Sequence, residues 1–424
     1  MVFLMMLLRP EVVFALFLYA FVIRGGQLVL GGLNLTAVLL IATFVALIFP
    51  VLAGRPLRFS LRASDLFLLV FLLVLFVASY IAPDPSAGLR KASLFGTTVF
   101  VPYVIARLVF KTYAQIRTFL TVILIVATSI AFNLIALSLS SDYIGGRLQF
   151  FEANPIPTGT LMAVGSAIAA VGITSRLFRT RTAKAFCLLA VGACIYGLFL
   201  SGVRGPLIAL LIGSAFYAFF ALRSAARKLN VSIGAAVTGV IVVMTFNTWY
   251  PYIERSIPNV GSYRLQTIKE GLSTQQRIEE YRLASEMFFE HPLGGAGTSA
   301  FGLTVWGYPH NIFLEIASEM GLIGLFTFLC FLGAVMLSGV KYLSARRADG
   351  INVSAKAIGL TVIVVAITLL VGRQFSFALT MHKDLFVFLG IIVNLPSIHS
   401  AYLRRSQQIN AQMSAETVPS RVIE

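Results

Sequence analysis

The chain has 424 residues, of which 58% are hydrophobic and only 12% are charged, and its mean hydropathy is +0.89. This composition lies far outside the range of soluble domains, so it excludes a soluble enzyme or a soluble nucleic-acid-binding protein. The formal net charge of +16 must therefore be explained within a membrane protein.

Apolar stretches long enough to cross a bilayer recur along the whole sequence. A transmembrane helix needs about 20 predominantly apolar residues. We expect an all-α polytopic membrane protein, and we expect its first span to be retained, because no small-residue cleavage site follows it. The twelve spans predicted in this way lie near residues 11–24, 34–53, 64–82, 95–110, 118–140, 156–175, 185–201, 205–222, 231–249, 316–340, 353–372 and 378–398.

Basic residues gather on alternate connections between these spans. If the N-terminus is cytoplasmic, the cytoplasmic connections carry the whole positive excess, in clusters such as Arg55, Arg58 and Arg62. This is the distribution that the positive-inside rule describes. The sequence therefore predicts cytoplasmic N- and C-termini, and the charge requires no nucleic-acid partner.

The connection between the ninth and tenth spans is much longer than the others. It covers residues 250–309 and divides the chain into spans 1 to 9 (residues 1–249) and spans 10 to 12 (residues 310–402). A connection of this length in a compact protein is usually functional or disordered. We place it on the non-cytoplasmic side. The polar tail that follows, residues 403–424, is predicted to be cytoplasmic and disordered.

One part of this long connection has the pattern of a helix. Leu283, Met287 and Phe288 recur at helical spacing, and the pattern stops at Pro292 with glycines following. We expect an amphipathic helix over about 274–290, lying on the membrane surface or packed against the bundle.

A short turn, "SGVRGPL", places Arg204 between two apolar spans. An arginine at membrane depth is costly unless it faces a cavity, a protein partner or an anionic ligand. The alternative is an arginine that snorkels to anchor the helix end. The same two alternatives are open for Arg24, Arg90, Lys91 and Arg373.

The stretch "YPHNIFLEIASEMGLIGL" brings polar groups to the start of the tenth span. Asn311 can cap the helix, and Glu315 and Glu319 follow it on one helical face. Such a polar stripe must face protein or water. We expect the helix to present His310 to an outward-facing cavity, with the glycines at 321–324 allowing close helix packing. A purely structural hydrogen-bond network is the alternative.

Three stretches of the sequence resemble the O-antigen ligase superfamily, which includes O-antigen ligases and O-antigen and exopolysaccharide polymerases. "HN", nine residues and then "GLIG" matches its histidine-asparagine motif. "SGVRG" is similar to its short outer turn with an arginine. "RIEEYRLASEMFFEHPLGGAGTSAF" is similar to its arginine-led periplasmic helix, which a His-Pro-Leu-Gly-x-Gly turn follows. The long outer connection and the number of spans agree, and the specific motifs lie within residues 201–325.

The resemblance implies a GT-C-like glycosyltransferase of the bacterial inner membrane that faces the periplasm. Its donor would be a glycan on undecaprenyl diphosphate. Its acceptor would be a lipid A core sugar in a ligase, or another lipid-linked glycan in a polymerase. The diphosphate-binding arginines would correspond to Arg204 and Arg277, and the key histidine to His310. Further substrate contacts implied for this sequence are Asn311, Arg147, Arg264, Arg282 and Glu315.

The chemistry of this transfer fits the same residues. A lipid diphosphate leaves with growing negative charge, which two guanidiniums can bind bidentately without losing a proton. The sequence contains no Asp-x-Asp and no carboxylates spaced as a metal site, so we expect an inverting transfer with no metal and no cofactor. His310 could accept the proton of the acceptor hydroxyl, with Glu315 or Glu319 tuning it.

Two other classes of protein would share this topology. A transporter or flippase of lipid-linked sugars needs a cationic cavity, but we would expect charge deep in several spans and internal repeats. A non-catalytic assembly protein would not need both arginines. Among the enzymes, the "PHN" and "LE" context and the compact length favour a ligase over a polymerase. Membrane lipid surrounds the chain under every reading.

Overall fold

The protein is helical throughout the part that the computed structural model describes, apart from one small hairpin. Its strands, β1 (Val29–Leu30) and β2 (Leu33–Asn34), pair antiparallel. The all-α architecture expected from the sequence is therefore confirmed. The described residues are 9–24, 29–30, 33–52, 59–138, 155–175, 177–178, 180–221, 272–305, 307–348, 353–376 and 378–416.

The helices follow the apolar stretches of the sequence closely. One of them is a π-helical turn, η1, that joins α5 and α6 into one continuous helix, and η2 is a single 3-10 turn. Their bounds are α2 Pro10–Arg24, α3 Leu35–Leu52, α4 Ala63–Ser79, α5 Pro85–Phe95, η1 Gly96–Phe100, α6 Val101–Val109, α7 Tyr113–Ser138, α8 Pro155–Thr174, α9 Arg181–Ser201, α10 Arg204–Ala221, α13 Leu272–Glu290, α14 Ala300–Val305, α15 Ile312–Ala348, α16 Val353–Gly372, η2 Leu379–Met381 and α17 Lys383–Glu416.

By length and composition, seven helical segments in the described part of the chain can cross a membrane, and four shorter helices are also apolar. The predicted span at 231–249 lies outside the described residues. Each of the other predicted spans overlaps one of these helices. The seven long segments are Pro85–Val109, Tyr113–Ser138, Pro155–Thr174, Arg181–Ser201, Ile312–Ala345, Ser354–Gly372 and Lys383–Ile409, and the shorter ones are Pro10–Ala20, Leu35–Ile48, Ala63–Ser79 and Arg204–Phe220.

The fourth span is longer than the sequence pattern predicted. The apolar run begins near residue 95, but the helix begins ten residues earlier at Pro85, where the side chain of Asp84 accepts hydrogen bonds from the free backbone N–H groups of Ser86 and Ala87. The added turns contain Lys91, which an apolar scan counts against a span. The lysine is accommodated because its charge is neutralised inside the protein, as described below.

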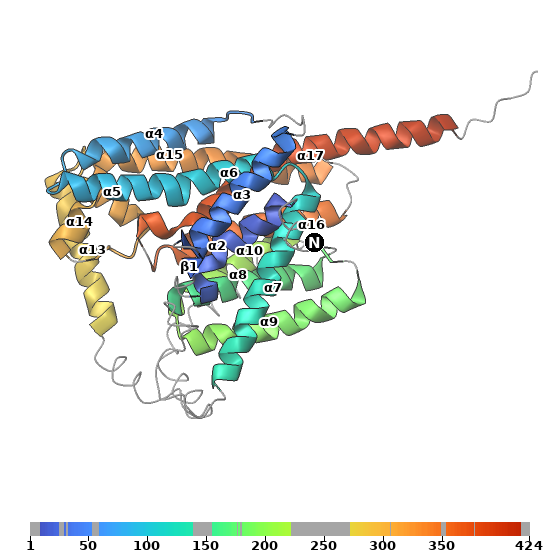
Figure 1. Ribbon diagram of the computed structural model, residues 1–424, viewed down its shortest axis with the longest axis horizontal. Coiled ribbons are helices and arrows are strands. Elements are labelled where there is room, and N and C mark those ends of the chain that lie inside the picture. Colours follow the sequence, from blue (N-terminus) through green and yellow to red (C-terminus); the bar gives the residue numbers. More distant parts are fainter. Residues whose placement is uncertain are drawn as a thin grey trace, which may run out of the picture.

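Aromatic side chains hold α4, α5, α15 and α17 together. Phe71 packs edge-on against Phe95 and also contacts Phe328, and Phe331 stacks on Phe386 with 5.6 Å between ring centroids. Buried aromatic pairs of this kind contribute about 0.5–1.5 kcal/mol beyond the area they bury. In Figure 1, α4, α5 and α15 run side by side, and α13 and α14 lie across the end of the bundle where α4 finishes and α15 begins. We call this the α13 end.

The polar C-terminal region is helical where the sequence predicted disorder. Helix α17 continues past the bundle as far as Glu416, and Figure 1 shows this part projecting away from the other helices. The reason is intrinsic propensity, since the stretch from Arg404 to Glu416 is rich in arginine, glutamine and alanine, which favour helix without any packing. The prediction of disorder was wrong for residues up to 416.

Candidate functional site

Helix α15 is broken at Gly321, and the backbone of another segment fills the break. Gly321 has φ 60° and ψ −157°, so the backbone N–H groups that follow cannot bond within the helix. Those of Leu322 and Ile323 donate instead to the carbonyls of Pro292 and Leu293, at 2.8 and 3.2 Å. Buried backbone groups need such partners, so the segment at 292–297 completes the helix.

The same segment also binds the backbone on the other side of the break. The N–H groups of Ala296 and Gly297 donate to the carbonyls of Ser318 and Glu319, at 2.9 and 3.0 Å. Thr298 then ties the segment to α4, because its N–H donates to the Ala78 carbonyl at 3.1 Å. Consequently α13, which ends at residue 290, and the first turns of α15 are held in one fixed arrangement.

Two glycines make this close approach possible. Gly295 has φ 73°, and a Cβ added there would lie 2.3 Å from the backbone of Glu319. A Cβ on Gly321 would lie 2.4 Å from the carbonyl oxygen of Leu293. Only glycine fits both the positive φ and the space. The "HPLGGAG" and "GLIG" stretches therefore interlock, whereas the sequence had suggested that Gly321 serves helix–helix packing.

Asn311 starts α15 as expected from the sequence. Its side-chain oxygen accepts hydrogen bonds from the N–H groups of Phe313 and Leu314, at 3.0 and 3.1 Å. This is the geometry of an N-cap, which satisfies backbone donors that the first turn leaves free. His310, the residue before it, is thereby fixed in position at the head of the helix.

His310 contacts a glutamate of α13. Its Nδ1 lies 2.9 Å from Oε2 of Glu280, and Glu280 is only 6% exposed. The other oxygen of this carboxylate accepts from Nε2 of Gln276 at 2.9 Å. His310 also has φ 50°, a conformation that is strained for a residue with a side chain.

This contact defines what the imidazole can do. A carboxylate at Nδ1 favours the tautomer with the proton on Nδ1, which leaves the lone pair on Nε2. Within the described residues, Nε2 of His310 has no hydrogen-bond partner, and the side chain is 21% exposed. The ring therefore presents an available base to whatever approaches from the α13 end.

Tyr308 lies beside the His310–Glu280 pair, and the charge of Arg277 acts on Tyr308. The Tyr308 ring packs on His310 with 4.6 Å between centroids. Burial raises the pKa of Tyr308, and the carboxylates of Glu315 and Glu280 add to this, so its phenol stays protonated and can donate a hydrogen bond. The positive charge of the half-buried Arg277 lowers that pKa in return, so its charge acts at Tyr308.

Glu315 and Glu319 do not contact His310. Both point inward to Lys91 of α5, whose ammonium lies 2.6 Å from Oε1 of Glu315 and 2.7 Å from Oε2 of Glu319. The second oxygen of Glu315 accepts from the N–H of Leu379 at 2.9 Å. Glu315 and Glu319 thus form a structural hydrogen-bond network, which was one of the two alternatives drawn from the sequence. The carboxylate beside His310 is that of Glu280 instead.

The connection between α16 and α17, residues 373–382, links this region to Arg204. On one side, the hydroxyl of Tyr281 on α13 contacts the carbonyl of Gln374 at 3.4 Å. On the other side, Gly205 packs so closely that a Cβ there would lie 2.9 Å from Cβ of Phe375. Arg204 is the first residue of α10, follows the left-handed Gly202 and is exposed. Arg204 and Arg277, the two arginines implied as diphosphate ligands, therefore lie on helices α10 and α13, and both helices contact the α16–α17 connection.

A comparison with known families finds a match over this part of the chain. A family model described as O-antigen ligase matches residues 185–329. The segment belongs to the O-antigen ligase superfamily. It contains Arg204, Arg277, Glu280 and His310, whereas Lys91 and the α16–α17 connection lie outside the match. No curated protein matches the chain.

The remaining residues implied by the likeness to O-antigen ligases are placed less closely to His310. Arg282 lies on the exposed face of α13 and pairs with Glu279 at 2.5 Å and with Glu286. Hydrogen bonding to Glu279 raises the pKa of Arg282. Arg147 and Arg264 lie outside the described residues, so their role is still a prediction from the superfamily likeness.

Sequence reasoning missed Glu280 and Lys91. Glu280 was one of several glutamates on the predicted amphipathic helix, and the helical pattern does mark it, because it shares the buried face with Ala284. Lys91 was grouped with helix-anchoring cations, because nothing local in the sequence shows that it faces two glutamates more than 220 positions away. That pairing depends on the packing of α5 on α15.

Proposed function

We propose that this chain is a glycosyltransferase of the O-antigen ligase type, which moves a glycan from undecaprenyl diphosphate to a hydroxyl of a lipid A core sugar. The observation that carries the proposal is the contact between His310 Nδ1 and Glu280 Oε2, which leaves Nε2 available. Membership of the superfamily supports a lipid-linked glycan as the donor. We propose that the site faces the periplasm from the inner membrane, in a GT-C-like arrangement.

In the proposed reaction, His310 acts as the general base. The acceptor hydroxyl gives its proton to Nε2 while its oxygen forms a bond to the anomeric carbon. The bond between that carbon and the diphosphate oxygen breaks, and the electron pair leaves with the lipid diphosphate. Attack opposite the leaving group inverts the anomeric centre. Glu280 stabilises the imidazolium that forms, because its carboxylate is buried and hydrogen-bonded to Nδ1.

Arg204 and Arg277 are proposed to bind the diphosphate. A guanidinium holds phosphate oxygens in bidentate fashion and keeps its charge at any physiological pH. Preorganised positive charge of this kind stabilises the negative charge that develops on the leaving group. The two arginines would thereby do the work that a divalent ion does in many sugar transferases, which makes the proposed transfer independent of metal.

The test is a transfer assay with purified protein in detergent, with undecaprenyl diphosphate-linked glycan as donor, in EDTA, with and without lipid A core. We expect glycan to appear on the core with the wild type and to be lost with His310→Ala, Arg204→Ala and Arg277→Ala. Glu286→Gln serves as the matched control on α13, since Glu286 is exposed and pairs only with Arg282 among the described residues.

Other outcomes would change the proposal. Chain growth on lipid-linked glycan without core would make the protein a polymerase that uses the same site. Full activity of His310→Ala and His310→Gln would exclude His310 as the general base. Absence of carrier release under every condition would favour a transporter of lipid-linked sugars.

A further inference from the structure

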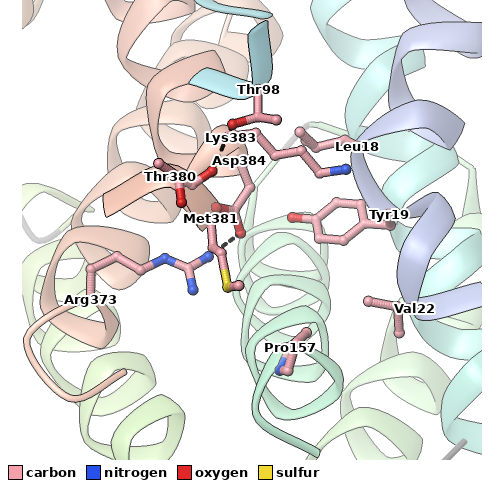
Figure 2. A pocket seen from close by; sticks show the side chains of 10 residues that line it. All are labelled: Leu18, Tyr19, Val22, Thr98, Pro157, Arg373, Thr380, Met381, Lys383 and Asp384. Carbon is pink, nitrogen blue, oxygen red and sulfur yellow. Dashed lines mark hydrogen bonds and ion pairs between the residues drawn. The ribbon is translucent and has the colours of Figure 1, made fainter. Parts of the chain in front are cut away.

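A separate cavity of about 230 Å³ lies beside the α16–α17 connection (Figure 2). Its walls come from α2, η1, the start of α8, η2 and the start of α17, and they include none of His310, Arg277 or Arg204. The proposed transfer does not use it. Gln374 in the same connection contacts α13, so the cavity wall and α13 adjoin one segment of the chain.

One side of the cavity is an ion pair that is already satisfied. Arg373 contacts the carboxylate of Asp384, and both side chains are almost fully buried. Figure 2 shows the Arg373 guanidinium reaching across to Asp384 below Thr380. The positive charge of Arg373 is therefore balanced within the protein, and the pair adds no net charge to the cavity wall.

The second cation of the cavity is not balanced in this way. Among the described residues no carboxylate lies within ion-pair distance of Lys383, since the neighbouring Asp384 is engaged by Arg373. The Lys383 ammonium donates to the Phe17 carbonyl at 3.2 Å and lies 4.7 Å from the Phe17 ring centroid. These contacts orient the ammonium but leave the cavity with one net positive charge.

Tyr19 contributes a hydrogen-bonding group that has no partner. The residue is 3% exposed, and in the described part of the chain its hydroxyl makes no hydrogen bond. Figure 2 shows this hydroxyl directed into the cavity, toward the Arg373–Asp384 pair. A buried hydroxyl without a partner costs free energy, so its position indicates that something occupies the space in front of it.

The lining selects the chemistry of that occupant. The Lys383 ammonium gives the lining a net positive charge and the Tyr19 hydroxyl has a proton to donate, which together favour an anion with several acceptor oxygens. A water molecule would satisfy Tyr19 but would leave the charge of Lys383 unbalanced. The other walls are apolar and include Leu18, Val22 and Met381. A group that is anionic at one end and apolar at the other matches both parts.

We propose that this cavity binds the phosphate group of a lipid, with Lys383 and Tyr19 as its ligands and the apolar wall along the adjoining chain. A buried ammonium favours phosphate strongly, and a hydroxyl donor adds geometric selectivity. The source can be a prenyl phosphate or a membrane phospholipid, because both present the same phosphate chemistry. The proposal does not depend on glycan transfer, so it can stand or fall independently of the proposed function.

The test is equilibrium binding of farnesyl phosphate to purified full-length protein, carried out in the wild type and in an Arg277→Ala background that weakens the proposed diphosphate site. We expect Lys383→Met and Tyr19→Phe each to weaken binding about tenfold or more in both backgrounds, the effect of losing one hydrogen bond to a charged group. Lys383→Arg keeps the charge and should retain most of the binding. The matched controls are Lys341→Met, near the C-terminal end of α15, and Tyr196→Phe on α9.

Three further ligands test whether the phosphate and the lipid chain are both needed for binding and which kind of lipid supplies them. Farnesol lacks the phosphate and should not bind; if it binds as tightly as farnesyl phosphate, the proposal is overturned. Inorganic phosphate should bind much more weakly, and equal affinity would refute a lipid site. Displacement by phosphatidylglycerol would support the site and identify a phospholipid as occupant, whereas farnesyl phosphate that phosphatidylglycerol fails to displace would identify a prenyl phosphate. Unchanged affinity in both Lys383→Met and Tyr19→Phe would also overturn it.

Discussion

Lys91 of α5 and Glu315 of α15 form a buried ion pair with 2.6 Å between Nζ and Oε1, although the two residues are far apart in the sequence. Glu319 lies 2.7 Å from the same ammonium. One cation thus serves two carboxylates, and the second oxygen of Glu315 holds the N–H of Leu379. The pair connects α15, the helix that follows His310 and Asn311, to the α16–α17 connection.

Removing this lysine should destabilise the protein strongly. Lys91→Met leaves two carboxylates buried without a cation, and breaking a buried pair in this way costs about 3–5 kcal/mol. We expect a clear fall in the unfolding temperature measured in detergent. The double variant Lys91→Met with Glu319→Gln removes one of the two charges and should recover part of the loss. Lys341→Met, at an exposed lysine, is the control, and an equal fall there would contradict the prediction.

The interlock at the helix break should tolerate no side chain. Gly321→Ala and Gly295→Ala each place a Cβ within about 2.4 Å of backbone atoms, in a conformation that alanine disfavours. We expect a loss of about 1–3 kcal/mol or more for each, read as a lower unfolding temperature and lower transfer activity. Gly333→Ala is a control in the same helix, because a Cβ there meets no atom within 4 Å. Similar losses for all three would show that the break has no special role.

Glu280 should matter for rate more than for binding. Glu280→Gln removes the charge that stabilises the imidazolium and can present its amide N–H to Nδ1, which favours the wrong tautomer. We expect kcat of the proposed transfer to fall about 10²-fold with little change in KM for the donor. Steady-state kinetics beside Glu286→Gln measure this. A change in KM alone would mean that Glu280 serves binding.

The two arginines of α13 should differ in importance. Arg277 is half-buried and its charge acts on Tyr308, which packs on His310, whereas Arg282 is exposed and pairs with Glu279 and Glu286. Arg282 lies on the exposed face of α13, whereas Glu280, which contacts His310, lies on the buried face, so the Arg282 guanidinium is directed away from the proposed site. We expect Arg277→Ala to lower kcat/KM at least 10²-fold and Arg282→Ala to lower it less than tenfold. A larger loss for Arg282→Ala than for Arg277→Ala would indicate that the diphosphate binds at the exposed face of α13.

Local pattern was enough to predict the helices, the cap at Asn311 and the helix that carries Arg277, because each depends on residues within a few turns. The helical pattern places Glu280 on the buried face of α13, but its contact with His310 could not be predicted, since that contact depends on how α13 lies across α15. The contacts of Lys91 could not be predicted either, because they depend on how α5 packs on α15. The length of the fourth span was underestimated because a pairing distant in sequence neutralises a charge that a hydropathy scan counts as unfavourable.

The break at Gly321 also gives a structural meaning to the nine residues that separate the "HN" and "GLIG" stretches. Each residue of an α-helix advances 1.5 Å and rotates by about 100°. A single residue inserted between Asn311 and Gly321 would therefore turn His310 away from Glu280 while the interlock held the far end in place. Deleting one residue would turn it in the opposite sense. The length of the nine-residue spacer, more than its composition, therefore determines where the His310 imidazole lies.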